Sequence, residues 1–148
     1  MAIKYLPDED HVVRHVNSQL LIRDPASDRV TGCFPQAFQL KPDETYLSAS
    51  WLEFFRGTPQ ERKAAVIAAV ASARTVKPRH GFAFGNVGEV KEACATFSMK
   101  IRVIHEPAKT NPNPAYTAVR GYRSDELELL ELLAGDAWSE VEEAKSYL

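Results

Sequence analysis

Residues 81–89 read GFAFGNVGE, and the order of structure types in this stretch decides the fold that we predict. Its first five residues favour a β-strand, and Asn86 followed by Glu89 is typical of a capping box at the start of a helix. Residues 90–96 favour that helix, and residues 100–104 favour a second strand. The stretch therefore predicts a βαβ unit whose strands are parallel neighbours in one sheet, joined by a right-handed crossover.

The turn inside this unit is the first candidate binding site. A strand that enters a helix through a glycine-containing turn presents backbone N–H groups and the positive end of the helix dipole. Gly85, Asn86 and Gly88 form the turn, and Arg79 adds positive charge nearby. We predict that these residues bind a phosphate or a carboxylate; the alternative is a turn that only caps the helix. The stretch lacks the patterns of a Walker A loop and of GxGxxG.

A second candidate is the proline-rich connection at residues 105–115, HEPAKTNPNPA, which leads to a strand predicted at residues 116–120. Its prolines fix their own φ angles and restrict the residues before them, so the connection should be stiff. His105, Asn113 and Tyr116 are predicted to form one edge of a site, and a purely structural turn is the alternative. Because the carboxyl ends of neighbouring parallel strands meet at one edge, this connection should lie beside the glycine turn.

Acid–base chemistry at such a site would depend on histidine. His80 and His105 are the candidates, because histidine titrates near neutral pH. No serine, threonine or cysteine stands in a recognisable nucleophile pattern. Ser48 and Ser50 are interpreted as helix caps, so the sequence indicates no catalytic constellation.

Metal and cofactor chemistry is not predicted. His11 and His15 are four residues apart, a spacing that suits zinc on a helix, but the valines around them favour a strand. On a strand, residues four apart lie roughly 13 Å from each other. Cys33 and Cys94 have no metal-ligand spacing and are expected to be unpaired, buried residues.

Residues 1–57 are predicted to form a β-rich section. An apolar run at residues 11–16 favours a strand. The runs at 19–23 and 29–34 flank the turn residues at 24–28, which predicts a hairpin.

The same section should end in a short helix over residues 50–57, preceded by a strand at 37–40. Trp51, Phe54 and Phe55 would share one face of that helix. We expect all three in the core, with a stacking platform for a ligand as the alternative.

Residues 58–121 are predicted to form an α/β section around a central alanine-rich helix. Thr58, Pro59 and Glu61 form the clearest start signal, because Thr caps, Pro suits the first helical position and Glu reaches back to the cap. The helix should continue to about residue 75. Its many small side chains predict burial on two sides.

Residues 122–148 are predicted to form an acidic tail of two helices, the second over residues 136–148. Residues 121–148 hold eight Asp and Glu against two Lys and Arg, whereas residues 1–120 hold 12 against 16. This asymmetry favours a protein partner that binds the acidic helices. A nucleic-acid partner is not expected, because the rest of the chain is only weakly basic; its best contacts would be Arg74, Lys77, Arg79 and Lys100.

The 148 residues, 45% of them hydrophobic, suffice for one domain with its own core. The predicted class is α+β, with a mixed sheet, an N-terminal hairpin section, the alanine-rich helix, one βαβ unit and two C-terminal helices. No apolar run approaches the roughly 20 residues that span a membrane, and a cytoplasmic location is expected.

Two functional hypotheses follow. The first is a small binding or adaptor protein that acts through protein–protein contacts, since no catalytic pattern is present. The second is a small enzyme or sensor that binds a phosphate-bearing, nucleotide-like ligand at the turn of residues 85–88, with His80 or His105 as acid–base group.

Overall fold

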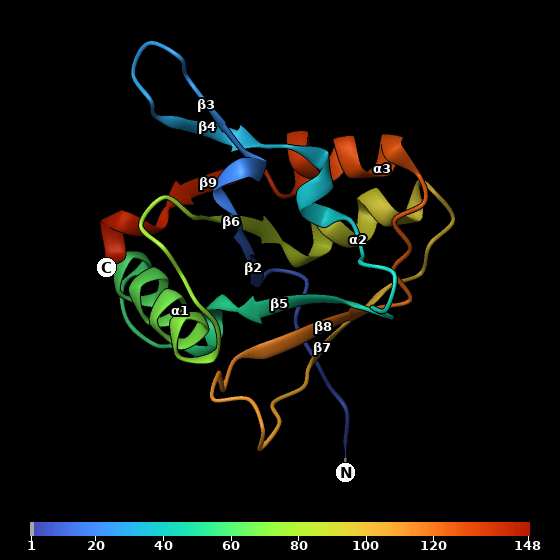
Figure 1. Ribbon diagram of the computed structural model, residues 1–148. Coiled ribbons are helices and arrows are strands. Elements are labelled where there is room, and N and C mark those ends of the chain that lie inside the picture. The colour runs from blue at the N-terminus through green and yellow to red at the C-terminus, as the bar shows by residue number, and fades with distance from the viewer. Residues whose placement is uncertain (1) are drawn as a thin grey trace.

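The computed structural model describes residues 2–148, and its main element is a seven-stranded antiparallel sheet (Figure 1). The strands follow the order β1-β7-β8-β5-β2-β6-β9. In that order their bounds are Lys4–Tyr5, Arg102–His105, Tyr116–Arg120, Leu47–Trp51, His11–Val16, Gly81–Asn86 and Glu140–Glu143. β3 (Leu21–Arg23) and β4 (Val30–Cys33) form a separate two-stranded hairpin that projects from the sheet (Figure 1).

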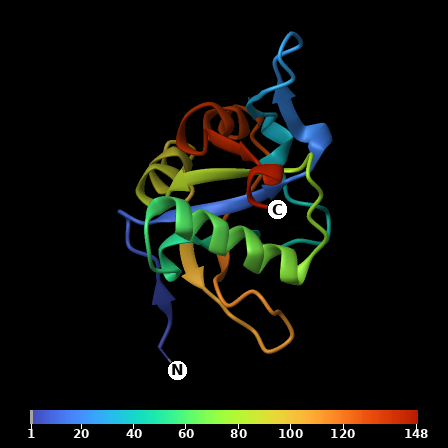
Figure 2. The same cartoon turned by 90° about the vertical axis from the view of Figure 1, so that its left-hand side faces the viewer.

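Helices cover both faces of the sheet (Figure 2). α1 (Pro59–Ala73) lies on one face, and α2 (Val87–Ala95) and α3 (Leu127–Leu132) lie on the other. A π-helical segment, η4 (Leu133–Ala137), continues α3. Within residues 2–148 the short 3-10 segments are η1 (Ser18–Leu20), η2 (Pro35–Phe38), η3 (Leu52–Phe54) and η5 (Ala144–Tyr147).

The sheet separates two apolar cores. On β2, Val13 packs into the core beneath α1, whereas Val12 and Val16 pack into the larger core beneath α2 and α3. On β6, Phe84 packs into the core beneath α1, and Ala83 packs into the larger core beneath α2 and α3. Successive strand side chains point to opposite faces, so both central strands are apolar on both faces.

The chain forms one compact α+β domain, as predicted. The prediction of a mixed sheet with a βαβ unit is wrong, because all pairings are antiparallel and β8, β5 and β2 lie between β6 and β7. β7 instead pairs with β8, which follows it after the proline-rich connection. Both edges of β6 are already taken, by β2 and β9.

The N-terminal hairpin is confirmed. β3 and β4 pair across the predicted turn, and their register shifts between Ile22 and Arg23. The strand predicted over residues 37–40 is wrong. η2 begins at Pro35, which cannot donate to a sheet ladder, and it covers the first half of that range, while the second half has no regular structure.

The short aromatic helix is also wrong. Ser50 and Trp51 belong to β5, and only the 3-10 turn η3 follows. Ser50 is buried and its hydroxyl accepts a hydrogen bond from Asn113 rather than capping a helix. Phe54 is 39% exposed and Trp51 is only partly buried, so this trio does not form a core face.

α1 begins as the sequence predicts. The Thr58 hydroxyl accepts from the Glu61 amide, and the Glu61 carboxylate accepts from the Thr58 amide. The helix buries only one face, through Val66, Ile67 and Val70. Burial on two sides is therefore wrong, because one face of α1 is open to solvent.

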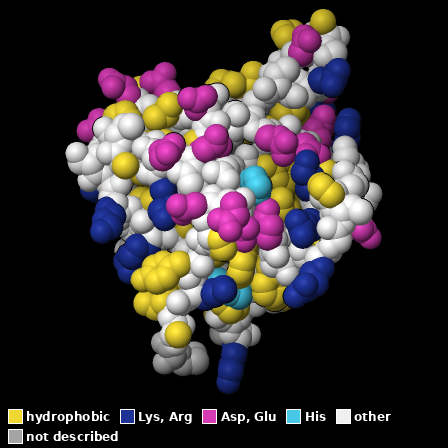
Figure 3. Space-filling model, turned by 180° about the vertical axis from the view of Figure 1, so that it is seen from behind, with side chains coloured by type: hydrophobic (Ala, Val, Ile, Leu, Met, Phe, Trp, Pro, Cys, Tyr) yellow, Lys and Arg dark blue, Asp and Glu magenta, His cyan; other side chains and the backbone are white. Residues whose placement is uncertain are grey.

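The C-terminal section contains one of the two predicted helices. α3 is present, but residues 140–143 form strand β9 along β6 rather than a second helix. Trp138 explains this change, because its buried ring donates through Nε1 to the carbonyl of Ala83 and fixes the chain beside β6. Leu148, at the end of the range predicted for that helix, is 61% exposed. Figure 3 shows acidic side chains over the upper part and the centre of the rear face, and basic side chains on both flanks and at the lower end.

Cys33 and Cys94 are buried and unpaired, as predicted, and burial raises the pKa of both thiols to about 11. None of the helices formed by residues 2–148 combines the length and the apolar character that a bilayer crossing requires.

Candidate functional site

The glycine turn that the sequence singled out has its amide groups in use. The amides of Val87 and Gly88 donate to the carbonyls of Asp10 and Asp8, both at 2.9 Å. The Glu89 amide donates to the side-chain oxygen of Asn86, also at 2.9 Å. An anion at this helix end would have to displace the acidic segment of residues 8–10 that already covers it.

Gly85 serves packing at this turn. A Cβ atom built at Gly85 would lie 2.8 Å from the ring of Trp138, so only glycine lets the indole approach β6. Asn86 and Gly88 do line an open groove of about 890 Å³ beside α2. Its acidic residues Asp8, Glu9, Glu89 and Glu92 outnumber its basic residues Lys91 and Lys100.

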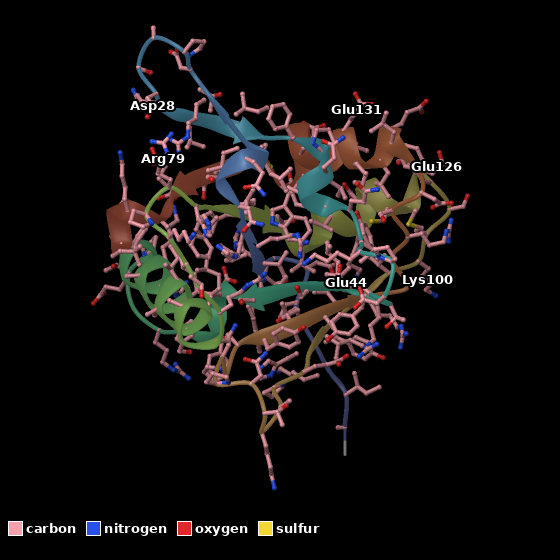
Figure 4. The ribbon with its side chains drawn as sticks, viewed as in Figure 1. Asp28, Glu44, Arg79, Lys100, Glu126 and Glu131 are labelled. Atoms are coloured by element: carbon pink, nitrogen blue, oxygen red, sulfur yellow. The ribbon has the colours of Figure 1, made fainter. Side chains whose placement is uncertain are left out.

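The predicted site residues do not all come together. Asn86 and His105 lie at the same end of the sheet but on strands separated by three others. His105 interacts through Nε2 with the carbonyl of Pro114 at 2.8 Å and packs against the ring of Trp51. Arg79 forms an ion pair with Asp28 of the projecting hairpin, as Figure 4 shows.

Asn113, Tyr116 and His80 instead lie at a second place, where β2 and β5 part. These strands form only two residue pairs, Val12 with Trp51 and Val13 with Ser50. β2 continues for three more residues, all of which pair with β6 on its other side. The gap between the diverging strands is the β2–β5 cleft, centred on Arg14, His15, Ser48 and Arg74.

The side chain of Arg14 occupies the point where the ladder stops. It donates through Nε to the carbonyl of Ala37 and through Nη1 to the carbonyl of Ser48, both at 2.7 Å. Burial lowers the pKa of this guanidinium to about 10, so it remains charged at neutral pH. Within residues 2–148 no carboxylate forms an ion pair with Arg14 or with the exposed Arg74.

Two cavities meet at this centre. The inner cavity, of about 240 Å³, extends toward Ser50, Asn111, Asn113 and Tyr116. The outer cavity, of about 370 Å³, extends toward Gln36, Gln39, Lys41 and Glu44. Both are lined in part by Arg14, His15, Ser48 and Arg74.

His15 and His80 form a direct pair across the cleft wall. His15 Nε2 lies 2.8 Å from His80 Nδ1, and the amide of Lys77 also donates to that Nδ1 at 3.3 Å. His80 Nδ1 is therefore the acceptor and His15 Nε2 carries the proton. His15 Nδ1 is left as an acceptor that is buried without a partner in the described part of the chain.

Both imidazoles of this pair are held neutral. Burial lowers the pKa of His15 to about 3, and the positive charge of Arg74 acts in the same direction. Burial also lowers the pKa of His80, with help from Lys77. Neutral rings beside arginines add no further positive charge to the cleft, so its cations are the two arginines and Lys41.

The floor of the inner cavity is held by the proline-rich connection. The Asn113 side chain donates to the Ser50 hydroxyl at 2.9 Å and accepts from the Ala115 amide at 3.0 Å. The Tyr116 hydroxyl lies 3.0 Å from that of Tyr46, and burial raises the pKa of Tyr116. These bonds orient Asn113 and Tyr116 and fix the cavity shape.

Sequence reasoning missed Arg14, Ser48 and Arg74. One signal was present for Arg14, because in HVVRHV it shares a strand face with Val12 and Val16, where a charged residue is costly to bury. Ser48 was interpreted only as a helix cap, and Arg74 was named only as a possible nucleic-acid contact. Their place in the cleft depends on how β2 and β5 diverge.

Comparison of the chain with protein-family models, with curated protein sequences and with solved structures finds no match.

Proposed function

We propose that this protein binds a small anionic ligand in the β2–β5 cleft. The observation that carries the proposal is Arg14, a desolvated cation that lines the cleft and donates to two backbone carbonyls. Among residues 2–148 it forms no ion pair, and Glu44 acts on it only at longer range. Removing a charge from water costs free energy unless an opposite charge compensates. A bound phosphate or carboxylate would supply that charge.

The surroundings of Arg14 support the same ligand class. Arg74 lies at both cavities, so a ligand at the centre would contact two guanidinium groups. Guanidinium groups bind phosphate and carboxylate through paired, charge-assisted hydrogen bonds. Glu44 lies in the outer cavity, away from the inner one, and its charge favours an anion at the centre or the inner end.

This proposal keeps the ligand class predicted from the sequence and moves its site. Asn113 and Tyr116, both predicted as ligand-binding residues, line the cleft, and His80 contacts its wall through His15. Binding at Gly85, Asn86, Gly88 and Arg79 stays a prediction without support from the geometry. The acid–base role of His80 also stays a prediction.

Calorimetric titration with inorganic phosphate tests the proposal. Arg74→Ala is the decisive variant, because Arg74 is exposed and its side chain makes no bond that the fold needs. Losing one hydrogen bond to a charged group costs about 1.4 kcal/mol, so we expect about tenfold weaker binding. Arg79→Ala is the matched control, since Arg79 pairs with Asp28 outside the cleft.

Two results would contradict anion binding in the cleft. One is a wild-type protein that shows no heat of binding with millimolar phosphate or acetate. The other is an Arg74→Ala protein that binds as tightly as wild type while Arg79→Ala loses binding, which would place the anion near the projecting hairpin.

A protein partner on the acidic surface is the second candidate. Leu127 on α3 is 57% exposed beside acidic residues, and Figure 4 shows Glu126 and Glu131 projecting from α3 into solvent. An apolar side chain ringed by acids favours a basic partner. Deleting the C-terminal section would also remove Trp138 and β9, so a deletion would not test this surface alone. The double substitution Glu128→Lys and Glu131→Lys is the better test. If the double variant captures every protein that the wild type captures in a pull-down, binding of a partner at this acidic surface is contradicted.

A further inference from the structure

The β2–β5 cleft also carries information about the uncharged part of its ligand. Its two cavities meet at the arginine centre, so an anion bound there leaves two directions for the rest of the molecule. Ligand pockets typically measure about 300–1,000 Å³. The two cavities, about 240 and 370 Å³, therefore fit a small ligand in which the anion and its substituent are close together.

Neutral hydrogen-bonding groups line both directions. Asn111 accepts from the Asn113 amide through Oδ1, which leaves its NH₂ group free within the described chain. Gln36 and Gln39 face the outer cavity, and neither side chain forms a hydrogen bond with residues 2–148. Amide side chains combine donor and acceptor atoms, the arrangement that suits hydroxyl groups, which also do both.

His15 adds an unpaired acceptor at the same place. Its Nδ1 is buried beside the arginine centre without a hydrogen-bond donor among the described residues. Leaving a buried acceptor unsatisfied costs free energy. A ligand hydroxyl next to the anionic group would meet that need after a small shift of the ring, whereas a bare anion would not.

The cleft offers few aromatic side chains on which a flat base could stack. Tyr116 is the only Phe, Tyr or Trp among its lining residues, and its hydroxyl is already paired with that of Tyr46. Proteins that bind nucleotides through their bases usually provide a stacking side chain. This lining argues against the nucleotide-like ligand predicted from the sequence and for a ligand rich in hydroxyl groups.

From these observations we propose that the ligand is a small phosphorylated sugar or polyol, with its phosphate at Arg14 and Arg74 and its hydroxyls at the amides and His15. Phosphate is preferred to carboxylate because two guanidinium groups without carboxylate partners match a dianion. This inference rests on the proposed function, since it requires an anion in the cleft.

The experiment compares inorganic phosphate, ribose 5-phosphate, free ribose and adenosine monophosphate by calorimetric titration of the full chain. Ribose 5-phosphate should bind at least tenfold more tightly than phosphate, ribose alone should not bind, and the adenine group should bring no gain over ribose 5-phosphate. Equal affinity for phosphate and ribose 5-phosphate would overturn this inference and leave the proposed function standing. Binding of none of them would overturn both.

Two further outcomes are decisive. Adenosine monophosphate binding more than tenfold more tightly than ribose 5-phosphate would overturn the inference, because it would reveal a base-binding surface. Gln36→Ala should weaken ribose 5-phosphate several-fold and leave phosphate unchanged, whereas the control Gln19→Ala, exposed on η1 and outside both cavities, should change neither. A Gln36→Ala protein that loses phosphate and ribose 5-phosphate equally would argue against hydroxyl recognition at Gln36.

Discussion

The two sides of β2 differ sharply although they belong to one strand. Toward β6, all six residues of β2 are paired, from His11 with Asn86 to Val16 with Gly81. Toward β5, pairing stops after two residues, and the guanidinium of Arg14 takes over the carbonyl of Ser48. We call the side of β2 that pairs with β6 the closed side and the side that faces β5 the open side. Residues of the closed side belong to the core, and the open side borders the β2–β5 cleft.

This difference shows that a binding site can be made by ending a ladder rather than by adding a loop. A β-ladder satisfies backbone groups locally, so strands that diverge need other donors and acceptors. Here a charged side chain supplies the donors, and this side chain has no ion-pair partner among residues 2–148.

The largest effect is expected on the closed side, from Gly85→Ala. The added methyl group would meet the ring of Trp138 at 2.8 Å, and that ring is fully buried and donates a hydrogen bond to the carbonyl of Ala83. Overpacking of this kind costs about 3 kcal/mol. Urea denaturation measures it, and Gly135→Ala is the control, because nothing lies within 4 Å of a Cβ built there. A Gly85→Ala protein as stable as wild type would show that the contact between β6 and Trp138 is loose.

A smaller effect is expected on the open side, from pH. The folded protein keeps the pKa of His15 near 3, mainly through burial, whereas the unfolded chain has a value of about 6.5. Between these values the unfolded state binds more protons, so stability present above pH 6.5 is lost as the pH falls below it. The slope is at most about 1.4 kcal/mol per pH unit, or about 2 kcal/mol by pH 5.

Denaturation at pH 7 and pH 5 checks this dependence. His15→Gln keeps a donor for His80 but cannot titrate, so its loss between the two pH values should be smaller than that of wild type. Identical losses in the two proteins would mean that His15 is not the group responsible.

The smallest effect is a difference between two helix caps. Thr58→Ala removes one cap bond at α1 and should cost about 1 kcal/mol. Asn86→Ala should cost about 1 kcal/mol more, because its NH₂ group also donates to the Asp8 carbonyl and ties residues 8–10 to α2. Thermal unfolding of the two variants measures the difference. Equal costs would mean that the link to residues 8–10 contributes nothing.

Local signals in the sequence predicted most elements correctly. The capping box at Thr58 and the run GFAFG depend only on neighbouring residues, so α1 and β6 were predictable. The same holds for the hairpin of β3 and β4, whose turn residues lie between its strands.

Pairing partners were not predictable in the same way. β7 does not lie beside β6, because β2 pairs with one edge of β6 and β9 pairs with the other. Residues 140–143 have a composition that suits a helix, and their strand state is set by the anchored Trp138. Asn113 and Tyr116 were predicted as site residues from the stiffness of their connection, but the arginines that define the cleft come from other parts of the chain.

The pairing of β2 with β6 has a consequence for how fast the protein folds. These two central strands are separated by almost half of the chain. Closing such a long loop costs conformational entropy before the two strands form any stabilising contact. We therefore expect refolding on the slow, millisecond-to-second scale of proteins rich in non-local pairings, with β2 joining the sheet late.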